Sequence, residues 1–204
     1  MKIYTYPRSR SLRVLWALEE SGIDYQTIPV DLFNPESGTG SPHSRRKVPF
    51  MEDGAVAIEE TMAICLYLCE KYSAMTLYPS ESQQKARVNA WISFALTDLE
   101  SPVWNLVKLL VYVPEEQRQS VLVDYFRQEA QQVVNTIQFS HGEEWIAGAG
   151  FSLADIFMAH TLQWAKLCGI MLSPEISEYL DRALSRSAYL RAQERNNQQN
   201  IELE

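Results

Sequence analysis

An acidic residue and a hydroxyl residue, Glu60 and Thr61, stand together where a helix is expected to begin. Two apolar runs, 48–51 and 55–58, precede them, and the Asp53-Gly54 pair between the runs is typical of a β-hairpin turn. The start of a helix carries unpaired backbone N–H groups and a partial positive charge. The pair could therefore cap the helix, or it could bind a zwitterion, with Thr61 receiving a carboxylate and Glu60 an ammonium group. The residues alone leave both interpretations open.

The elements that must position this pair form a compact α/β unit. Periodicity and turn residues predict, in order, a strand at 1–6, a helix from Leu12 to Gly22, a strand at 25–32, an irregular loop over 34–46, the two strands of the hairpin and a helix over about 60–72. Pro29 lacks a backbone N–H group, so it suits only an edge of the sheet or a bulge.

The rest of the chain is predicted to be helical. Amphipathic stretches indicate helices at about 81–111, 115–138, 153–168 and 174–195. Ser80 and Gln83 have the spacing of a capping box for the first of these helices. Ser152 and Asp155 have the same spacing at the third. We expect an α/β domain at 1–76, a linker at 77–84 and an all-helical domain at 85–204.

Composition argues against several classes of protein. The net charge of −8 argues against nucleic-acid binding, which needs clustered lysine and arginine. No apolar run approaches the roughly 20 residues of a membrane span, and the first residues lead into a predicted strand, unlike a signal peptide. Three cysteines without a CxxC motif or metal-ligand spacing indicate a reducing, cytoplasmic setting and no metal.

Several motifs in the same order make the chain similar to one family. "VPFMEDG" followed by "IEETMAI" resembles the V-P-x-L-x-D-G…E-S-x-A-I signature of the cytosolic glutathione S-transferases, and "LRVLWALEESGIDY" resembles their first helix. "LYPSESQQKARVNAW" is similar to the linker and next helix, and "FSLADIFMA" to a buried helix of the second domain. The resemblance implies a thioredoxin-like domain that binds glutathione, followed by a helical-bundle domain. It points to a bacterial-type member with serines in its first loop.

The resemblance also implies roles for individual residues. A cis peptide bond at Pro49 would turn the backbone of Val48 toward the cysteinyl unit of glutathione. Glu60 and Thr61 would hold the γ-glutamyl ammonium and carboxylate groups, with Thr61 standing where the family usually has serine. Lys47 would approach the glycine carboxylate.

The residues beside this motif are read less directly. Glu59, the neighbour of Glu60, is expected to face solvent. The loop His43-Ser44-Arg45-Arg46 departs from the family pattern. Its extra positive charge either strengthens binding of the glycine carboxylate or is a solvated surface. His43 is expected at the surface, although it could also contact the ligand.

The chemistry implied is attack by the sulfur of glutathione on an electrophile. The thiolate is the nucleophile, and a free thiol with a pKa of about 8.5 is only a few per cent ionised near neutral pH. A hydroxyl in the first loop, next to the positive end of the first helix, would lower that pKa. We rank Ser9 first, Ser11 second, with an alternative role as helix cap, and Tyr6 third. Arg10 stands where some bacterial relatives have a cysteine, which favours activation by a hydroxyl.

The second substrate is expected to be a small apolar electrophile. Trp104, Leu106, Leu109 and Tyr112 are candidates for its pocket, although residues of this kind at helical spacing also form cores. The family resemblance implies a homodimer and a role in detoxification. Two alternative functions are glutathione-dependent reduction of peroxides or disulfides, and a non-catalytic binding or regulatory protein on the same fold. Cys65 and Cys69 are interpreted as core residues.

Overall fold

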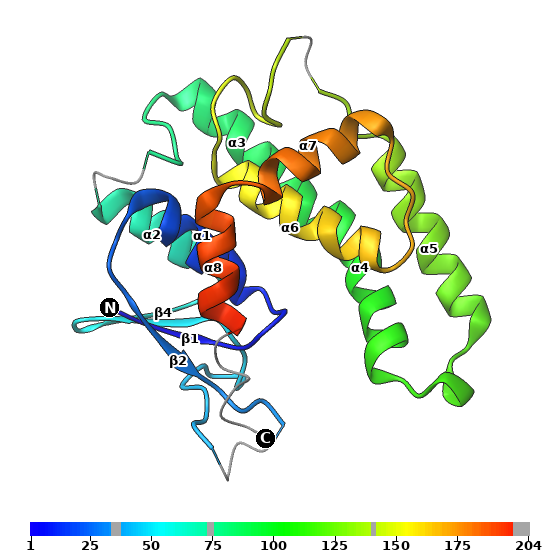
Figure 1. The fold of residues 1–204 in the computed structure, drawn as a ribbon, viewed down its shortest axis with the longest axis horizontal. Coiled ribbons are helices and arrows are strands. Elements are labelled where there is room, and N and C mark those ends of the chain that lie inside the picture. The colour runs from blue at the N-terminus through cyan, green and yellow to red at the C-terminus, as the bar shows by residue number, and fades with distance from the viewer. Residues whose placement is uncertain (34–37, 73–75, 140–141, 198–204) are drawn as a thin grey trace. The chain divides into compact units, whose positions relative to one another are not determined.

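The computed structural model describes residues 1–33, 38–72, 76–139 and 142–197. The chain divides into two compact units, of which one comprises Met1–Tyr78 with Ser185–Glu204 and the other Pro79–Leu184 (Figure 1). Part of the loop predicted over 34–46, namely 34–37, lies outside the described residues.

A four-stranded mixed sheet forms the base of the first unit. Its strands are β1 (Lys2–Thr5), β2 (Gln26–Pro29), β3 (Phe50–Asp53) and β4 (Val56–Glu59), in the spatial order β2-β1-β3-β4. β1 runs parallel to β2 and antiparallel to β3, and β3 and β4 form the predicted antiparallel hairpin. Pro29 ends the edge strand β2, and the next residue, Val30, donates its N–H to the carbonyl of Thr5. A missing donor at Pro29 therefore costs the ladder nothing.

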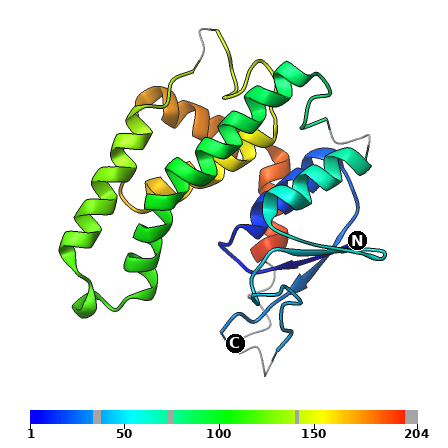
Figure 2. The same cartoon turned by 180° about the vertical axis from the view of Figure 1, so that it is seen from behind.

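Three helices lie on the same side of this sheet in Figures 1 and 2: α1 (Ser11–Ser21), α2 (Thr61–Lys71) and α8 (Ser187–Asn197). α1 ends at the predicted glycine, because Gly22 adopts φ +63° and its N–H bonds to the carbonyl of Leu18. The fully buried Trp16 of α1 packs edge-on against Tyr189 of α8, with ring centroids 4.9 Å apart.

The C-terminal helix is also tied to α1 by ion pairs. Glu20 accepts two hydrogen bonds from Arg186, at 2.6 and 2.7 Å, and a third from the indole N–H of Trp16 at 2.9 Å. Glu19 lies 2.8 Å from the guanidinium of Arg191 and 3.0 Å from that of Arg195. The ion pairs link residues more than 160 positions apart, so α8 is part of the first unit.

The helix predicted over 174–195 is therefore two helices, α7 (Pro174–Leu184) and α8. The prediction was wrong because the apolar pattern runs through the break at 185–186. α7 buries Tyr179 and Leu180 in the second unit, whereas α8 buries Tyr189 and Ala192 in the first. The expected all-helical domain, 85–204, differs in the same way from the compact unit, which ends at Leu184.

The described residues of the second unit form helices and no named strand. Its elements are α3 (Ser82–Phe94), η1 (Ala95–Leu99), α4 (Glu100–Val107), η2 (Lys108–Tyr112), η3 (Glu115–Gln117), α5 (Ser120–Asn135), α6 (Leu153–Leu167) and α7. α3 to η2 replace the single predicted helix over 81–111, with two π-helical stretches at η1 and η2. α5 starts five residues later than predicted, because 115–117 form a 3-10 turn. α6 is buried along most of its length.

The starts of α3 and α6 were both predicted to carry a capping box, and only the one on α6 is present. The predicted box at Ser80 does not cap α3; the Glu81 carboxylate accepts from the N–H groups of Gln83 and Gln84, at 2.9 and 2.8 Å. The predicted box at Ser152 and Asp155 is present on α6. Asp155 is fully buried, and it also accepts from the N–H of Ile146 at 2.9 Å and from the hydroxyl of Tyr179 at 3.0 Å. Burial raises the pKa of Asp155, and these donors oppose that rise.

Candidate functional site

The sheet register brings three loops of the first unit to one end of the sheet. Tyr4, near the end of β1, pairs with Phe50 at the start of β3, and Phe50 pairs with Glu59 at the end of β4. Because the pairings are antiparallel, the loop after β1, the residues before β3 and the residues after β4 emerge at the same edge. The predicted residues 6–11, 47–49 and 60–61 therefore belong to one region of the fold.

The loop after β1 contains the three candidate activating residues. Ser9 donates its hydroxyl to the carbonyl of Tyr6 at 2.7 Å, and its Oγ lies 2.8 Å from the Oγ of Ser11. The Ser9 oxygen also accepts from the backbone N–H of Ser11 at 3.1 Å. Ser9 thus satisfies one of the unpaired donors at the start of α1, the role that the sequence suggested for Ser11.

The three candidates differ in accessibility. Ser11 is the first residue of α1 and is fully buried, whereas Ser9 is half-buried. The half-buried ring of Tyr6 packs edge-on against Phe33, with centroids 5.8 Å apart. Ser9 is therefore the more accessible of the two serines, and it lies at the positive end of an 11-residue helix. The ranking of Ser9, Ser11 and Tyr6 stays a prediction.

The residues before β3 form an extended edge with a cis peptide bond. The bond between Val48 and Pro49 is cis, as the resemblance implied. Pro49 is buried, Val48 is half-buried and Lys47 is exposed, and the hydroxyl of Ser41 donates to the carbonyl of Lys47. The ammonium group of Lys47 is thus free to approach an anion, and the ligand contacts expected of Lys47, Val48 and Pro49 stay predictions.

The junction of β4 and α2 carries a strained acidic residue. Glu60 adopts φ +67° and ψ +126°, a conformation that a residue with a side chain rarely takes, and its side chain is 64% exposed. Thr61 follows as the first residue of α2 and is buried. The N–H groups of this helix start could receive an anion, and the carboxylate of Glu60 beside them is exposed to solvent on a side chain that can pair with a cation. The geometry thus suits the zwitterion interpretation, while the roles themselves stay predictions.

Glu59 is a site residue that the sequence analysis missed. It was expected to face solvent, but its carboxylate accepts from both the backbone N–H and the hydroxyl of Ser44, the latter at 2.9 Å. The two hydrogen bonds from Ser44 lower the pKa of Glu59, and the bond from its backbone N–H has the larger effect. Glu59 therefore anchors the loop that leads to Lys47. The only feature of the sequence that could have indicated this role of Glu59 is its position next to Glu60.

The anchored loop places an arginine against the candidate ammonium site. Buried His43 accepts the N–H of Arg45 on Nδ1 at 3.0 Å, and the guanidinium of Arg45 pairs with the carboxylate of Glu60. The expectation that His43 lies at the surface was wrong, because its ring is used to hold the loop. Neither reading of the positive charge in this loop anticipated the pairing of Arg45 with Glu60.

The predicted electrophile-pocket residues all belong to the second unit. Trp104 stacks on Trp164, with centroids 5.5 Å apart, and meets the exposed Tyr112 edge-on at 6.3 Å. Leu106 is fully buried in the core of this unit, and Leu109 is half-buried. Their part in a pocket stays a prediction. Cys65 is fully buried and Cys69 half-buried, as expected of core residues.

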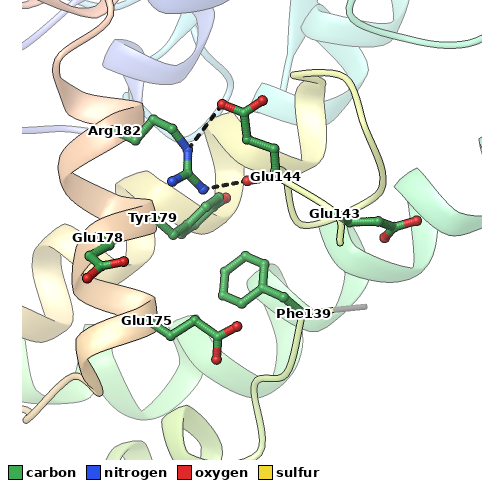
Figure 3. A pocket seen from close by; sticks show the side chains of 7 residues that line it. All are labelled: Phe139, Glu143, Glu144, Glu175, Glu178, Tyr179 and Arg182. Atoms are coloured by element: carbon green, nitrogen blue, oxygen red, sulfur yellow. Dashed lines mark hydrogen bonds and ion pairs between the residues drawn. The ribbon is translucent and has the colours of Figure 1, made fainter. Parts of the chain in front are cut away.

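An acidic hollow of about 210 Å³ lies elsewhere in the second unit (Figure 3). Its lining consists of Phe139, Glu143, Glu144, Glu175, Glu178, Tyr179 and Arg182. Arg182 crosses one side and donates to the carbonyl of Glu144. No residue predicted for catalysis or binding lines this hollow.

Neither a metal site nor a membrane-crossing helix is found among the described residues. No group of three or more His, Cys, Asp or Glu residues there is arranged to hold a metal ion. No described helix combines the length and apolarity that a membrane crossing needs.

Comparisons with known proteins agree on one family. Residues 3–76 match the sequence profile described as "Glutathione S-transferase, N-terminal domain". The chain is 28% identical over 209 residues to maleylacetoacetate isomerase of Pseudomonas aeruginosa, covering 96% of this chain and 97% of that one. It is 28% identical over 165 residues to glutathione S-transferase 4 of Zea mays, covering 76% and 73%.

Solved structures share the fold over nearly the whole chain. Glutathione transferase F2 of Populus trichocarpa superposes with a TM-score of 0.81 at 20% identity, covering 97% of this chain and 99% of that one. A sphingomonad glutathione S-transferase complexed with glutathione gives a TM-score of 0.80 at 24% identity, covering 96% and 98%. These likenesses support a thioredoxin-like domain followed by helices. The chain is thus similar to glutathione S-transferases: residues 3–76 match the profile of their N-terminal domain, and the fold of nearly the whole chain matches theirs.

Proposed function

We propose that this protein is a glutathione transferase, which joins the sulfur of glutathione to small apolar electrophiles. The observation that carries the proposal is the convergence of three elements at one edge of the sheet. They are the serine loop before α1, the cis-proline segment before β3 and the Glu60–Thr61 start of α2. A peptide with a thiol, an extended backbone and a zwitterionic end matches these three elements in turn.

The zwitterionic γ-glutamyl end is assigned to the start of α2. Its carboxylate would accept from the backbone N–H and hydroxyl of Thr61, and its ammonium would pair with Glu60. Helix starts favour anions by up to about 1 kcal/mol at exposed positions, and a charge-assisted hydrogen bond adds to this. The glycine carboxylate at the other end is assigned to the exposed ammonium group of Lys47.

The sulfur is assigned to the start of α1. The hydroxyl of Ser9 would donate a hydrogen bond to the thiolate, and the helix dipole would stabilise its charge. In the reaction, the thiolate attacks an electron-poor carbon and forms a C–S bond. A leaving group departs with the bonding electrons. In an epoxide, the C–O bond breaks instead, and the ring oxygen keeps the electron pair and takes a proton from water. The thiol proton is released to solvent before the attack.

Further properties belong to the same proposal. The second substrate is assigned as a small apolar electrophile on Trp104 and Tyr112, whose rings are partly accessible in the second unit. We also propose a homodimer, a role in detoxification and a cytoplasmic location, with no metal cofactor. All three cysteines are free, which fits a reducing compartment.

An ultraviolet pH titration of glutathione bound to the protein tests the proposal. The expected result is thiolate absorbance that appears at least one pH unit below the pKa of about 8.5 of a free thiol. Turnover is then measured with aryl halides, epoxides and organic hydroperoxides. Binding without a shifted thiol pKa would overturn the transferase assignment, and turnover of hydroperoxides alone would replace conjugation by reduction.

A further inference from the structure

We propose that Arg45 is an internal competitor for the ammonium site of Glu60, and so sets how strongly the protein selects ligands that carry an α-amino group. This inference rests on the proposed function and deepens it. Arg45 places a guanidinium on the carboxylate oxygen Oε1 of Glu60, the group assigned to the ligand ammonium. A free ligand must replace this cation to bind there.

Arg45 is built into this position by its neighbours. Glu59 holds Ser44 through two hydrogen bonds, and buried His43 accepts the N–H of Arg45 at 3.0 Å. Together with the bond from the N–H of Arg46 to the carbonyl of His43 at 2.8 Å, these bonds fix the backbone on both sides of the arginine, so its side chain starts within reach of Glu60. The backbone of Arg45 is fixed, whereas its side chain is 58% exposed, so the guanidinium can move away from Glu60 into solvent.

The exposure of the pair decides the size of the competition. With side chains 58% and 64% exposed, the pair is screened by water and contributes up to about 1 kcal/mol. At tenfold per 1.4 kcal/mol this corresponds to an affinity penalty of up to about five-fold. The ligand ammonium displaces Arg45 at that cost. A ligand without the amino group leaves the pair of Arg45 and Glu60 intact and loses nothing to it.

Isothermal titration calorimetry with two ligands tests this inference. One ligand is glutathione, and the other is its deaminated analogue, in which the γ-glutamyl unit is replaced by a glutaryl unit. For Arg45→Ala we expect glutathione to bind two- to five-fold more tightly than to the unmodified protein, while the analogue binds equally to both. In Glu60→Gln the further change Arg45→Ala should alter neither affinity.

A neighbouring arginine provides a matched control for the loss of charge. Arg46 adopts φ +52°, which asparagine tolerates well, so Arg46→Asn removes one positive charge without straining the loop. We expect Arg46→Asn to leave the ratio of the two affinities unchanged. Unchanged or weaker binding of glutathione to Arg45→Ala would overturn the inference, with the proposed function intact. An equal gain for both ligands would also overturn it, because the effect would then be general charge. Failure of the unmodified protein to bind glutathione would overturn both.

Discussion

Removal of the Ser9 hydroxyl should separate catalysis from stability. Ser9 Oγ accepts from the N–H of Ser11 at 3.1 Å, so Ser9→Ala loses a helix-capping acceptor as well as the proposed donor to sulfur. Loss of a cap to alanine costs about 1 kcal/mol, whereas a change to glycine costs only about a few tenths. Ser9→Gly should therefore keep nearly full stability and still lack the hydroxyl.

The expected loss of turnover follows from the thiol pKa. If the site lowers the pKa of the thiol from about 8.5 by about one to two units, loss of the Ser9 donor should reduce the thiolate fraction by about 8- to 25-fold at about pH 7. We expect kcat to fall by this factor in both variants. The Kd for glutathione should change much less, because the assigned binding groups remain.

Two measurements decide the matter. The first is kcat against pH at saturating glutathione, in which the activity of both variants should recover as pH rises through the pKa of a free thiol. The second is thermal unfolding, in which Ser9→Ala should lower Tm by about 2–4 °C and Ser9→Gly by less. Full activity in Ser9→Gly would refute the assignment and transfer it to Ser11 or Tyr6. A fall in Ser9→Ala alone would show that the effect is structural.

Three further predictions concern stability and the loop. Asp155→Asn should leave one buried backbone N–H facing an amide donor and lower the free energy of unfolding, measured by urea denaturation, by about 1–3 kcal/mol. The control Asp181→Asn, at an exposed position of α7, should change this free energy by less than about 0.5 kcal/mol. Equal effects of the two changes would contradict the capping role of Asp155. Because the pKa of Glu59 is lowered in the folded protein, its contribution to stability is present above the ordinary pKa of 4.5 and is lost as pH falls through the lower folded-state pKa. Hydrogen exchange at the Ser44 N–H, corrected for the intrinsic rate, should therefore accelerate only at acid pH. In Glu59→Ala the same exchange should be fast at neutral pH. Glu20→Ala should free Arg186 and the α8 helix, seen as faster proteolysis after residue 185 with α7 still protected; unchanged cleavage would mean that apolar packing alone holds α8.

Contacts close in the chain were predictable because they depend on residue type and spacing. The hairpin turn at Asp53-Gly54, the end of α1 at Gly22 and the box at Asp155 were each predicted and are present. In each case a local rule has one dominant solution: a positive φ suits glycine, and an acid three residues into a helix reaches back to its start. The family resemblance extended this to the cis bond before Pro49.

The pairings between distant residues were decided only by the tertiary structure. Glu59 and Glu60 look equivalent in the sequence, yet one anchors Ser44 and the other meets Arg45, 15 positions away. Side chains of this length can reach many partners, and the partner is chosen when the sheet brings two loops to one edge. The same reason separates α8 from α7, since periodicity states that a helix has an apolar face and is silent on what covers it. The sequence thus determined most of the elements and the resemblance to one family, and the fold determined where long helices break and which charges meet.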